Sequence, residues 1–134
     1  MSYSPNLLKN LGIKLAMEFA REKRPSEIRL FQAILLQAFE DSMSNSGFKK
    51  DTYWKEDSHK WFVGNCSDFQ EVCWHADMDP QMIREEYMKL VKNGVVKFSK
   101  LQRSWINYRE YYKAYRNAKT KEERAEVKKK IYSG

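Results

Sequence analysis

Residues 67–94, SDFQEVCWHADMDPQMIREEYMKLVKNG, contain two apolar patterns with helical spacing on either side of Asp79-Pro80. Ser67-x-x-Gln70 predicts a capping box at the start of the first helix. Asp79 can cap the second helix, and Pro80 suits its first position, because its φ is preset and no donor is needed there. Asn93-Gly94 predicts the end of the second helix. The stretch therefore predicts two helices joined by a tight turn.

This pair fits the requirements of a helix-turn-helix, which are a small residue at the crossing, a sharp turn and apolar anchors after it. Cys73 or Ala76 supplies the small residue, and Ile83 is an anchor. Asp77 takes the corner, where Gly is more usual, and Asp tolerates a left-handed backbone better than most residues. The expected shared core consists of Phe69, Val72, Ala76, Met78, Ile83 and Tyr87. The alternative is an ordinary pair of core helices in a bundle.

Helical periodicity also covers the N-terminal half of the chain. A helix is predicted over residues 6–23, although Gly12 weakens it. The next helix, about 27–43 with Ser26 as N-cap, is apolar around most of its circumference and is expected to be the most buried. A further helix within 51–63 is expected to turn four aromatic residues inward. They are Tyr53, Trp54, Trp61 and Phe62.

The C-terminal part predicts helices over residues 100–118 and 120–131, and the pattern Thr120-x-x-Glu123 favours a break at Thr120. The predicted fold is thus a single all-α domain spanning residues 1–134. It is a helical bundle with a helix-turn-helix at about 67–93 and basic, aromatic C-terminal helices at about 100–131.

The charge of the chain is unevenly distributed. The 134 residues carry a net charge of +7. Residues 92–134 hold 13 Lys or Arg and 4 Asp or Glu, a balance of +9, so residues 1–91 hold 12 and 14, a balance of −2. A basic tail on a nearly neutral body indicates a polyanionic partner such as nucleic acid. The alternative is a solvated charged helix.

An aromatic stripe runs along the predicted helix 100–118. Its members recur at steps of four, three, four and three: Leu101, Trp105, Tyr108, Tyr112 and Tyr115. Three uses fit this spacing, namely packing on the body, the seam of a homodimer, and stacking on single-stranded bases. Such stripes belong to a core more often than to a ligand platform, so we assign Trp105 and Tyr112 to packing first and the neighbouring cations to nucleic acid second.

The sequence also argues against several classes of protein. The longest apolar run, residues 33–36, is far too short to span a membrane, and residues 1–5 do not begin a signal peptide. A cytoplasmic protein without a membrane partner is expected. The spacing of Cys66, Cys73, His59 and His75 matches no common zinc pattern, so buried thiols and surface imidazoles are expected, and no metal.

No catalytic constellation is recognisable. The five glycines are scattered, so no phosphate-binding loop is present in the sequence, and neither histidine has a recognisable nucleophile partner. We therefore expect no enzyme activity, no catalytic residues and no cofactor.

The segment DFQEVCWHADMDPQMIREEY resembles the F-x-x-V-C-x-x-x-x-M/L-D-P-x-x-I/V-R segment of small helix-turn-helix proteins from phages, prophages and gene transfer agents. In those proteins a Trp-containing helix precedes the motif, as Trp61-Phe62 does here. The similarity covers roughly residues 54–92. It implies transcription regulation, or another DNA transaction, without enzyme activity.

The resemblance implies that the second helix enters the major groove of double-stranded DNA with its N-terminus first. Gln81, Met82, Arg84 and Glu85 would then lie nearest the bases, where Gln pairs with adenine and Arg with guanine. Against this, the adjacent carboxylates of Glu85 and Glu86 repel phosphate. The expected phosphate contacts are Lys89 and Lys92, followed by the later cations Lys100, Arg103, Arg109, Lys113 and Arg116.

The favoured function is that of a DNA-binding transcriptional regulator of the phage type. The alternative is a non-enzymatic phage assembly or packaging protein, or an adaptor that binds a protein such as RNA polymerase.

Overall fold

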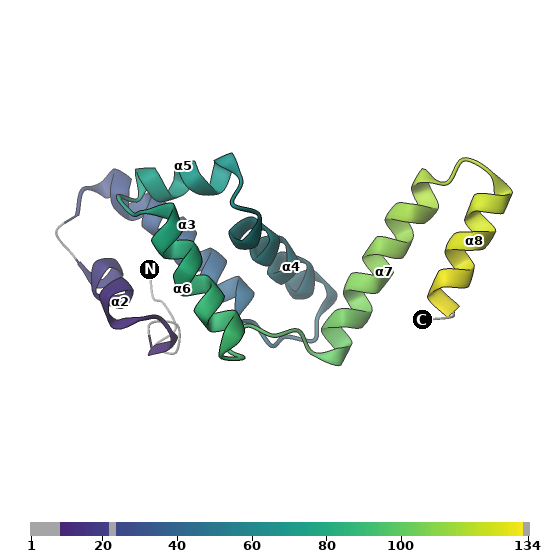
Figure 1. Ribbon diagram of the computed structural model, residues 1–134, viewed down its shortest axis with the longest axis horizontal. Coiled ribbons are helices and arrows are strands. Elements are labelled where there is room, and N and C mark those ends of the chain that lie inside the picture. The colour runs from purple at the N-terminus through teal and green to yellow at the C-terminus, as the bar shows by residue number, and fades with distance from the viewer. Residues whose placement is uncertain (1–8, 22–23, 133–134) are drawn as a thin grey trace. The chain divides into compact units, whose positions relative to one another are not determined.

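The computed structural model describes residues 9–21 and 24–132, and over these residues the chain is helical without strands. The predicted all-α class is confirmed. The helices follow one another along the chain as Figure 1 shows. Their bounds are α2 Ile13–Ala20, α3 Ser26–Ser42, α4 Lys49–Gly64, α5 Ser67–His75, α6 Pro80–Lys92, α7 Lys100–Asn117 and α8 Lys121–Tyr132. Over the described residues, every helix is too short or too polar to be a membrane-span candidate.

The chain packs as two compact units. The first unit comprises Met1–Ser44 and Trp54–Lys97, and the second comprises Asn45–Tyr53 and Phe98–Gly134. The division falls inside α4, whose first residues belong to the second unit. That the whole chain forms one domain stays a prediction.

The core of the first unit is built by α3, α4, α5 and α6, together with α2. Its centre is aromatic: the Phe62 ring stacks on Tyr87 at 4.2 Å between centroids, and Phe39 lies 4.7 Å from Phe62. All six residues of the predicted shared core are buried, which confirms that expectation. They are Phe69, Val72, Ala76, Met78, Ile83 and Tyr87.

Two expectations about burial are wrong. On α3, Leu30 and Ile34 are 61% and 41% exposed, so the helix buries one face and not most of its circumference. On α4, Trp54 is 49% exposed. The reason lies in the helical period, because spacings of four and three place Lys55, His59 and Phe62 on the inward face and leave Trp54 beside it.

Several helix starts also differ from expectation. The helix predicted over 6–23 is interrupted, because Leu11 and Gly12 lie outside the helix and Gly12 is the N-cap of α2; residues 1–8 and 22–23 lie outside the described part. Pro25, and not Ser26, is the N-cap of α3. At α5 the N-cap is Cys66, whose side chain makes no capping bond.

The capping box predicted at Ser67 and Gln70 is therefore wrong. The Gln70 side chain donates to the carbonyl of Asn65 at 3.0 Å. Asn65 has a left-handed backbone, with φ at 48°, just after α4 ends at Gly64. The helix predicted within 51–63 is confirmed, and α4 continues one residue further, to Gly64.

In the second unit, α7 packs against α8. The capping box at the start of α7, Ser99 with Gln102, was not expected from the sequence. The buried Gln102 also donates to the Ser46 carbonyl at 3.0 Å, which joins α7 to the 45–48 segment. The predicted break at Thr120 is confirmed, since α8 begins at Lys121 and the Glu123 amide donates to the Thr120 hydroxyl at 3.2 Å.

Candidate nucleic-acid interface

The corner between α5 and α6 has the local geometry that the sequence predicts. Asp77 adopts φ 59°, the left-handed conformation expected for the corner. The Asp79 carboxylate accepts from the Gln81 amide at 3.0 Å, and Pro80 is the first residue of α6. Gly94, at φ 76°, follows the end of α6. These short-range features are confirmed, because each depends on residues adjacent in sequence.

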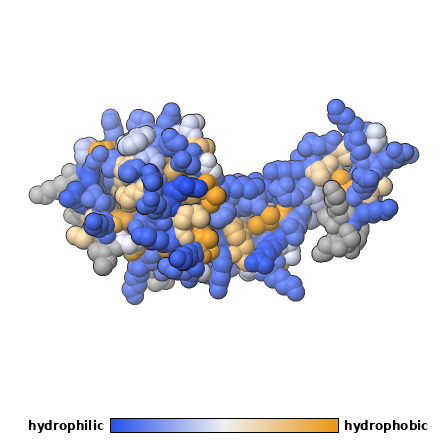
Figure 2. Space-filling view, in the orientation of Figure 1, coloured by the Kyte–Doolittle hydropathy of each residue, from blue (hydrophilic) through white to orange (hydrophobic). Residues whose placement is uncertain are grey.

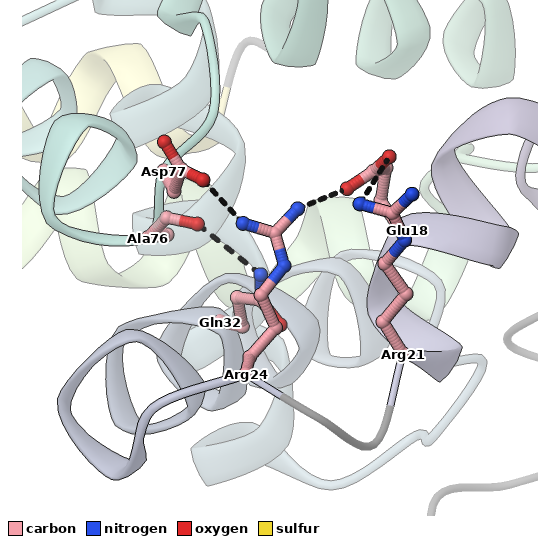
Figure 3. Close-up of polar contacts among 6 residues, drawn as sticks. All are labelled: Glu18, Arg21, Arg24, Gln32, Ala76 and Asp77. Carbon is pink, nitrogen blue, oxygen red and sulfur yellow. Dashed lines mark hydrogen bonds and ion pairs between the residues drawn. The ribbon is translucent and has the colours of Figure 1, made fainter.

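Arg24, which lies outside α5 and α6, stabilises the corner between these two helices. In Figure 3 the guanidinium of Arg24 lies between the carboxylates of Asp77 and Glu18, and donates to both, to Glu18 at 2.6 Å. These partners raise the pKa of Arg24. The Gln32 amide donates to the Ala76 carbonyl at 3.2 Å, so α3 also contacts the corner. Arg24 was not singled out from the sequence, and its separation of 53 residues from Asp77 leaves no local signal.

A groove of about 630 Å³ runs along α5 and α6. Six residues of α6 were predicted to lie at the DNA, and the groove lining brings five of them together; the sixth, Met82, is half-buried against the core, so its expected place nearest the bases is wrong. The five are Gln81, Arg84, Glu85, Lys89 and Lys92. Two exposed apolar side chains share the lining, Trp74 at 64% and Met88 at 41%.

Several of the polar side chains in this groove already have partners in the protein. The side-chain amide of Gln81 donates to the Glu85 carboxylate at 3.3 Å, and the Lys89 ammonium donates to the Glu86 carboxylate at 3.2 Å. Arg84 is half-buried and donates to the Val63 carbonyl near the end of α4 at 3.2 Å. In the structure, Arg84 thus ties α6 to α4.

The groove has a weakly positive balance. Its charged lining residues are Arg84, Lys89 and Lys92 against Asp79 and Glu85, which gives a formal charge of +1. The ion pair between Lys89 and Glu86 is exposed on the lysine side, where the side chain is 68% exposed, and solvent-exposed pairs of this kind are weak. The ammonium can therefore exchange Glu86 for another anion at small cost.

The five predicted contacts beyond α6 lie along α7, in the second unit. Helical geometry places Arg109, Lys113 and Arg116 on one face and Lys100 and Arg103 on the other side. The Arg109 guanidinium lies 4.8 Å from the centroid of the Tyr53 ring. The cations of α7 are thus divided between two faces of the helix.

The aromatic stripe of α7 is mostly at the surface. Trp105 is half-buried and donates to the Gly47 carbonyl at 3.1 Å, so its assignment to packing is confirmed. Tyr112 is 41% exposed and lies against Tyr108 of its own helix, which shows that its assignment to packing is wrong. Few apolar residues face α7 from α8, because residues 121–129 contain only Ala125 and Val127 of this kind.

A buried polar group lies on the inward face of α4. The Lys55 ammonium donates to the carbonyls of Ser44 at 2.6 Å and Lys97 at 2.5 Å, and burial lowers the pKa of Lys55 to about 8. His59 Nδ1 lies 2.6 Å from the Tyr87 hydroxyl. Burial lowers the pKa of His59 and raises that of Tyr87 to about 12. These groups fix connecting segments and the core, and they lie apart from the groove lining.

The cysteines and histidines do not form a metal-binding cluster in the described part of the chain. Cys73 is buried, which raises the pKa of its thiol to about 12, whereas Cys66 is exposed at the start of α5. The expectation that both thiols are buried is therefore wrong for Cys66. His75 is exposed as expected, but His59 is half-buried because it faces Tyr87.

No known protein family, curated protein or solved structure matches the chain. The resemblance to phage helix-turn-helix proteins stays a prediction that depends on the residues around Asp79-Pro80.

Proposed function

We propose that the protein binds double-stranded DNA through α5 and α6, used as a helix-turn-helix, and that it acts as a transcriptional regulator of the phage type. One observation carries the proposal. At the corner, Asp77 turns the chain with a left-handed backbone, Asp79 caps α6, and α6 then exposes Gln81 and Glu85 along the groove. This is the arrangement by which a second helix can enter a major groove with its N-terminus first.

The roles of the α6 side chains follow from their positions. Gln81 is exposed at the first turn, where its amide can exchange the bond to Glu85 for a bidentate contact with adenine. Lys89 and Lys92 are exposed further along the helix and suit phosphate contacts. Arg84 reaches a guanine only after it releases the Val63 carbonyl, so its first role is to fix the angle between α6 and α4.

The proposal is tested by fluorescence anisotropy of a labelled random-sequence duplex at low and raised salt concentrations. We expect binding that weakens steeply with salt, because each phosphate contact releases counterions. Lys92→Gln is expected to lower the slope of log affinity against log salt by about 1. Lys60→Gln is the matched control, since it removes the same charge from α4, outside the groove. The absence of binding at low salt, or an equal change in both variants, would contradict the proposal.

Base reading has its own test once a preferred duplex has been selected from a random pool. Gln81→Ala is expected to cost about 1–3 kcal/mol on that duplex and little on random duplex. Arg84→Ala is expected to weaken both duplexes, because it loosens α6 from α4. If Arg84→Ala weakened only the selected duplex, Arg84 would be a base contact in the complex.

A second function is favoured by the exposed Trp74 and Met88, since large apolar side chains in a groove are typical of protein interfaces. In this case the protein is a phage assembly or packaging protein, or an adaptor that binds RNA polymerase. The same titration separates the two functions, because an adaptor of this kind does not need to bind duplex at low salt.

A further inference from the structure

The second unit presents aromatic rings at the surface that the proposed duplex contact does not use. Tyr108 and Tyr112 are 39% and 41% exposed, one turn apart on α7. Their ring centroids lie 4.7 Å apart and the Tyr108 side chain is hydrogen-bonded to Tyr112, which raises the pKa of Tyr112. The two rings hold each other in place and form a small exposed platform. Figure 2 shows that hydrophobic side chains also reach the surface elsewhere, among hydrophilic ones.

Cations lie next to this platform and further along the aromatic stripe of α7. The Lys49 ammonium lies 5.2 Å from the Tyr108 centroid, and the Arg124 guanidinium 5.5 Å from that of Tyr115. Lys113 and Arg116 are exposed next to the stripe on α7. Over its 18 residues α7 carries 5 basic side chains and a single acidic one, Glu110. The chemistry of this surface is thus aromatic and positively charged at the same time.

We propose that Tyr108 and Tyr112 stack on unpaired bases, and that the second unit thereby binds single-stranded nucleic acid, with Lys49, Lys113 and Arg116 contacting its phosphates. Exposed rings cannot stack on bases that are already stacked inside a duplex, but any unpaired base offers a ring face. The charge balance distinguishes this partner from a second copy of the chain, since two α7 helices with the same positive surface repel each other.

This proposal does not rest on duplex binding by α6, because the residues proposed to bind single strands all belong to the second unit. The proposal also accounts for the exposure of the α7 tyrosines, which packing does not explain. A helix that served only to cover a core would bury its apolar stripe, whereas α7 has one buried residue, the polar Gln102.

The experiment measures binding of the full chain to labelled oligothymidine of about 16 nucleotides, a length comparable to the larger sites of single-strand binding proteins. Tyr108→Leu and Tyr112→Leu remove a ring and keep an apolar side chain. Each is expected to weaken binding roughly tenfold, whereas Tyr112→Phe is expected to retain it. Trp54→Leu is the matched control, because it removes a 49% exposed ring from the first unit, outside the groove, and should leave oligothymidine affinity unchanged. Circular dichroism confirms that each variant is folded.

Three results would overturn the proposal. In the first, both leucine variants bind oligothymidine as tightly as the wild type. In the second, the control loses as much affinity as they do. In the third, sedimentation shows that the wild type is a dimer and the leucine variants are monomers with unchanged oligothymidine affinity, so that the tyrosines form a seam between copies. The duplex assay with Lys92→Gln reports on α6 separately, so failure of one proposal is distinguishable from failure of the other.

Discussion

The two units of the molecule use aromatic side chains in opposite ways. In the first unit, Phe39, Phe62 and Tyr87 are fully buried and touch one another, whereas in the second unit Tyr108 and Tyr112 are about two-fifths exposed. The three buried rings come from three helices, α3, α4 and α6, whereas the two exposed rings lie one turn apart on α7. The two sets differ in what faces them, because α4 is covered by apolar faces of other helices and α7 is faced by a highly charged α8. Spacing predicts a stripe, and the partner element determines whether the stripe is buried.

The largest expected effect comes from removing a ring from each unit. Phe62→Ala deletes a side chain that packs on Phe39, Phe69 and Tyr87, and is expected to lower the free energy of unfolding by about 3–5 kcal/mol. Tyr112→Ala leaves no sealed cavity, and is expected to cost about 1 kcal/mol or less. Urea unfolding followed by circular dichroism measures both. Equal losses would show that the exposed stripe is as important for stability as the core.

The same contrast explains how much of the fold could be predicted from the sequence. The corner was predictable because Asp77, Asp79 and Pro80 act on their immediate neighbours. The six core residues flanking it followed from periodicity. Exposure on α3 and α7 could not be predicted, because it depends on which helix faces Leu30 or Tyr112 in three dimensions. Periodicity of apolar residues also misplaced the inward face of α4, where polar Lys55 and His59 accompany Phe62.

The candidate site was predictable to a similar degree. The five α6 residues share a groove because spacings of three and four place them on one face of the helix, whereas Met82 on the same helix packs against the core. Their partners could not be predicted, since the bonds from Arg84 to Val63 and from Arg24 to Asp77 join residues far apart in sequence.

The second-largest expected effect comes from removing the buried ammonium of Lys55 from the first unit. Lys55→Met leaves the carbonyls of Ser44 and Lys97 without this donor, and is expected to cost about 2–3 kcal/mol at pH 7. Lys14→Met, at an exposed position of α2, is expected to cost less than about 0.5 kcal/mol. Urea unfolding of both variants gives the comparison. A similar loss in the two would mean that the Lys55 bonds contribute little.

Lys55 also predicts a dependence on pH, because its pKa is about 8 in the folded chain and near its ordinary 10.5 in the unfolded chain. Between these values the unfolded chain binds more protons, so this group makes stability rise with pH from about 8 to 10.5. The unfolding free energy of the wild type should therefore rise relative to that of Lys55→Met over that range. A constant difference would contradict the lowered pKa.

A smaller effect compares the helix caps of the two units. Asp79→Ala removes the cap of α6, and Ser99→Ala removes the cap of α7; each is expected to cost about 1 kcal/mol. Amide hydrogen exchange shows which helices lose stability in each variant. We expect Asp79→Ala to raise exchange in α6 and the core helices, and Ser99→Ala to raise it in α7 while the first-unit core is unchanged. If both variants changed exchange in both units alike, the units would unfold together.

The smallest expected effect concerns His59, which lies against the core ring of Tyr87. Burial, helped by the Lys55 ammonium and opposed by Glu56, lowers the pKa of His59 below its ordinary 6.5. As the pH falls through 6.5 the unfolded chain binds a proton before the folded chain does, so unfolding takes up a proton and stability decreases. Urea midpoints measured from pH 7 to about 5 should therefore decline less in His59→Gln than in the wild type.

His75→Gln is the control for this experiment. His75 belongs to the same unit but is exposed, and it is His59 whose ring nitrogen lies at the Tyr87 hydroxyl. The His75→Gln variant should retain the decline seen in the wild type. If His59→Gln declined as steeply as both, the acid sensitivity would not come from this imidazole, and the lowered pKa of His59 would be contradicted as its cause.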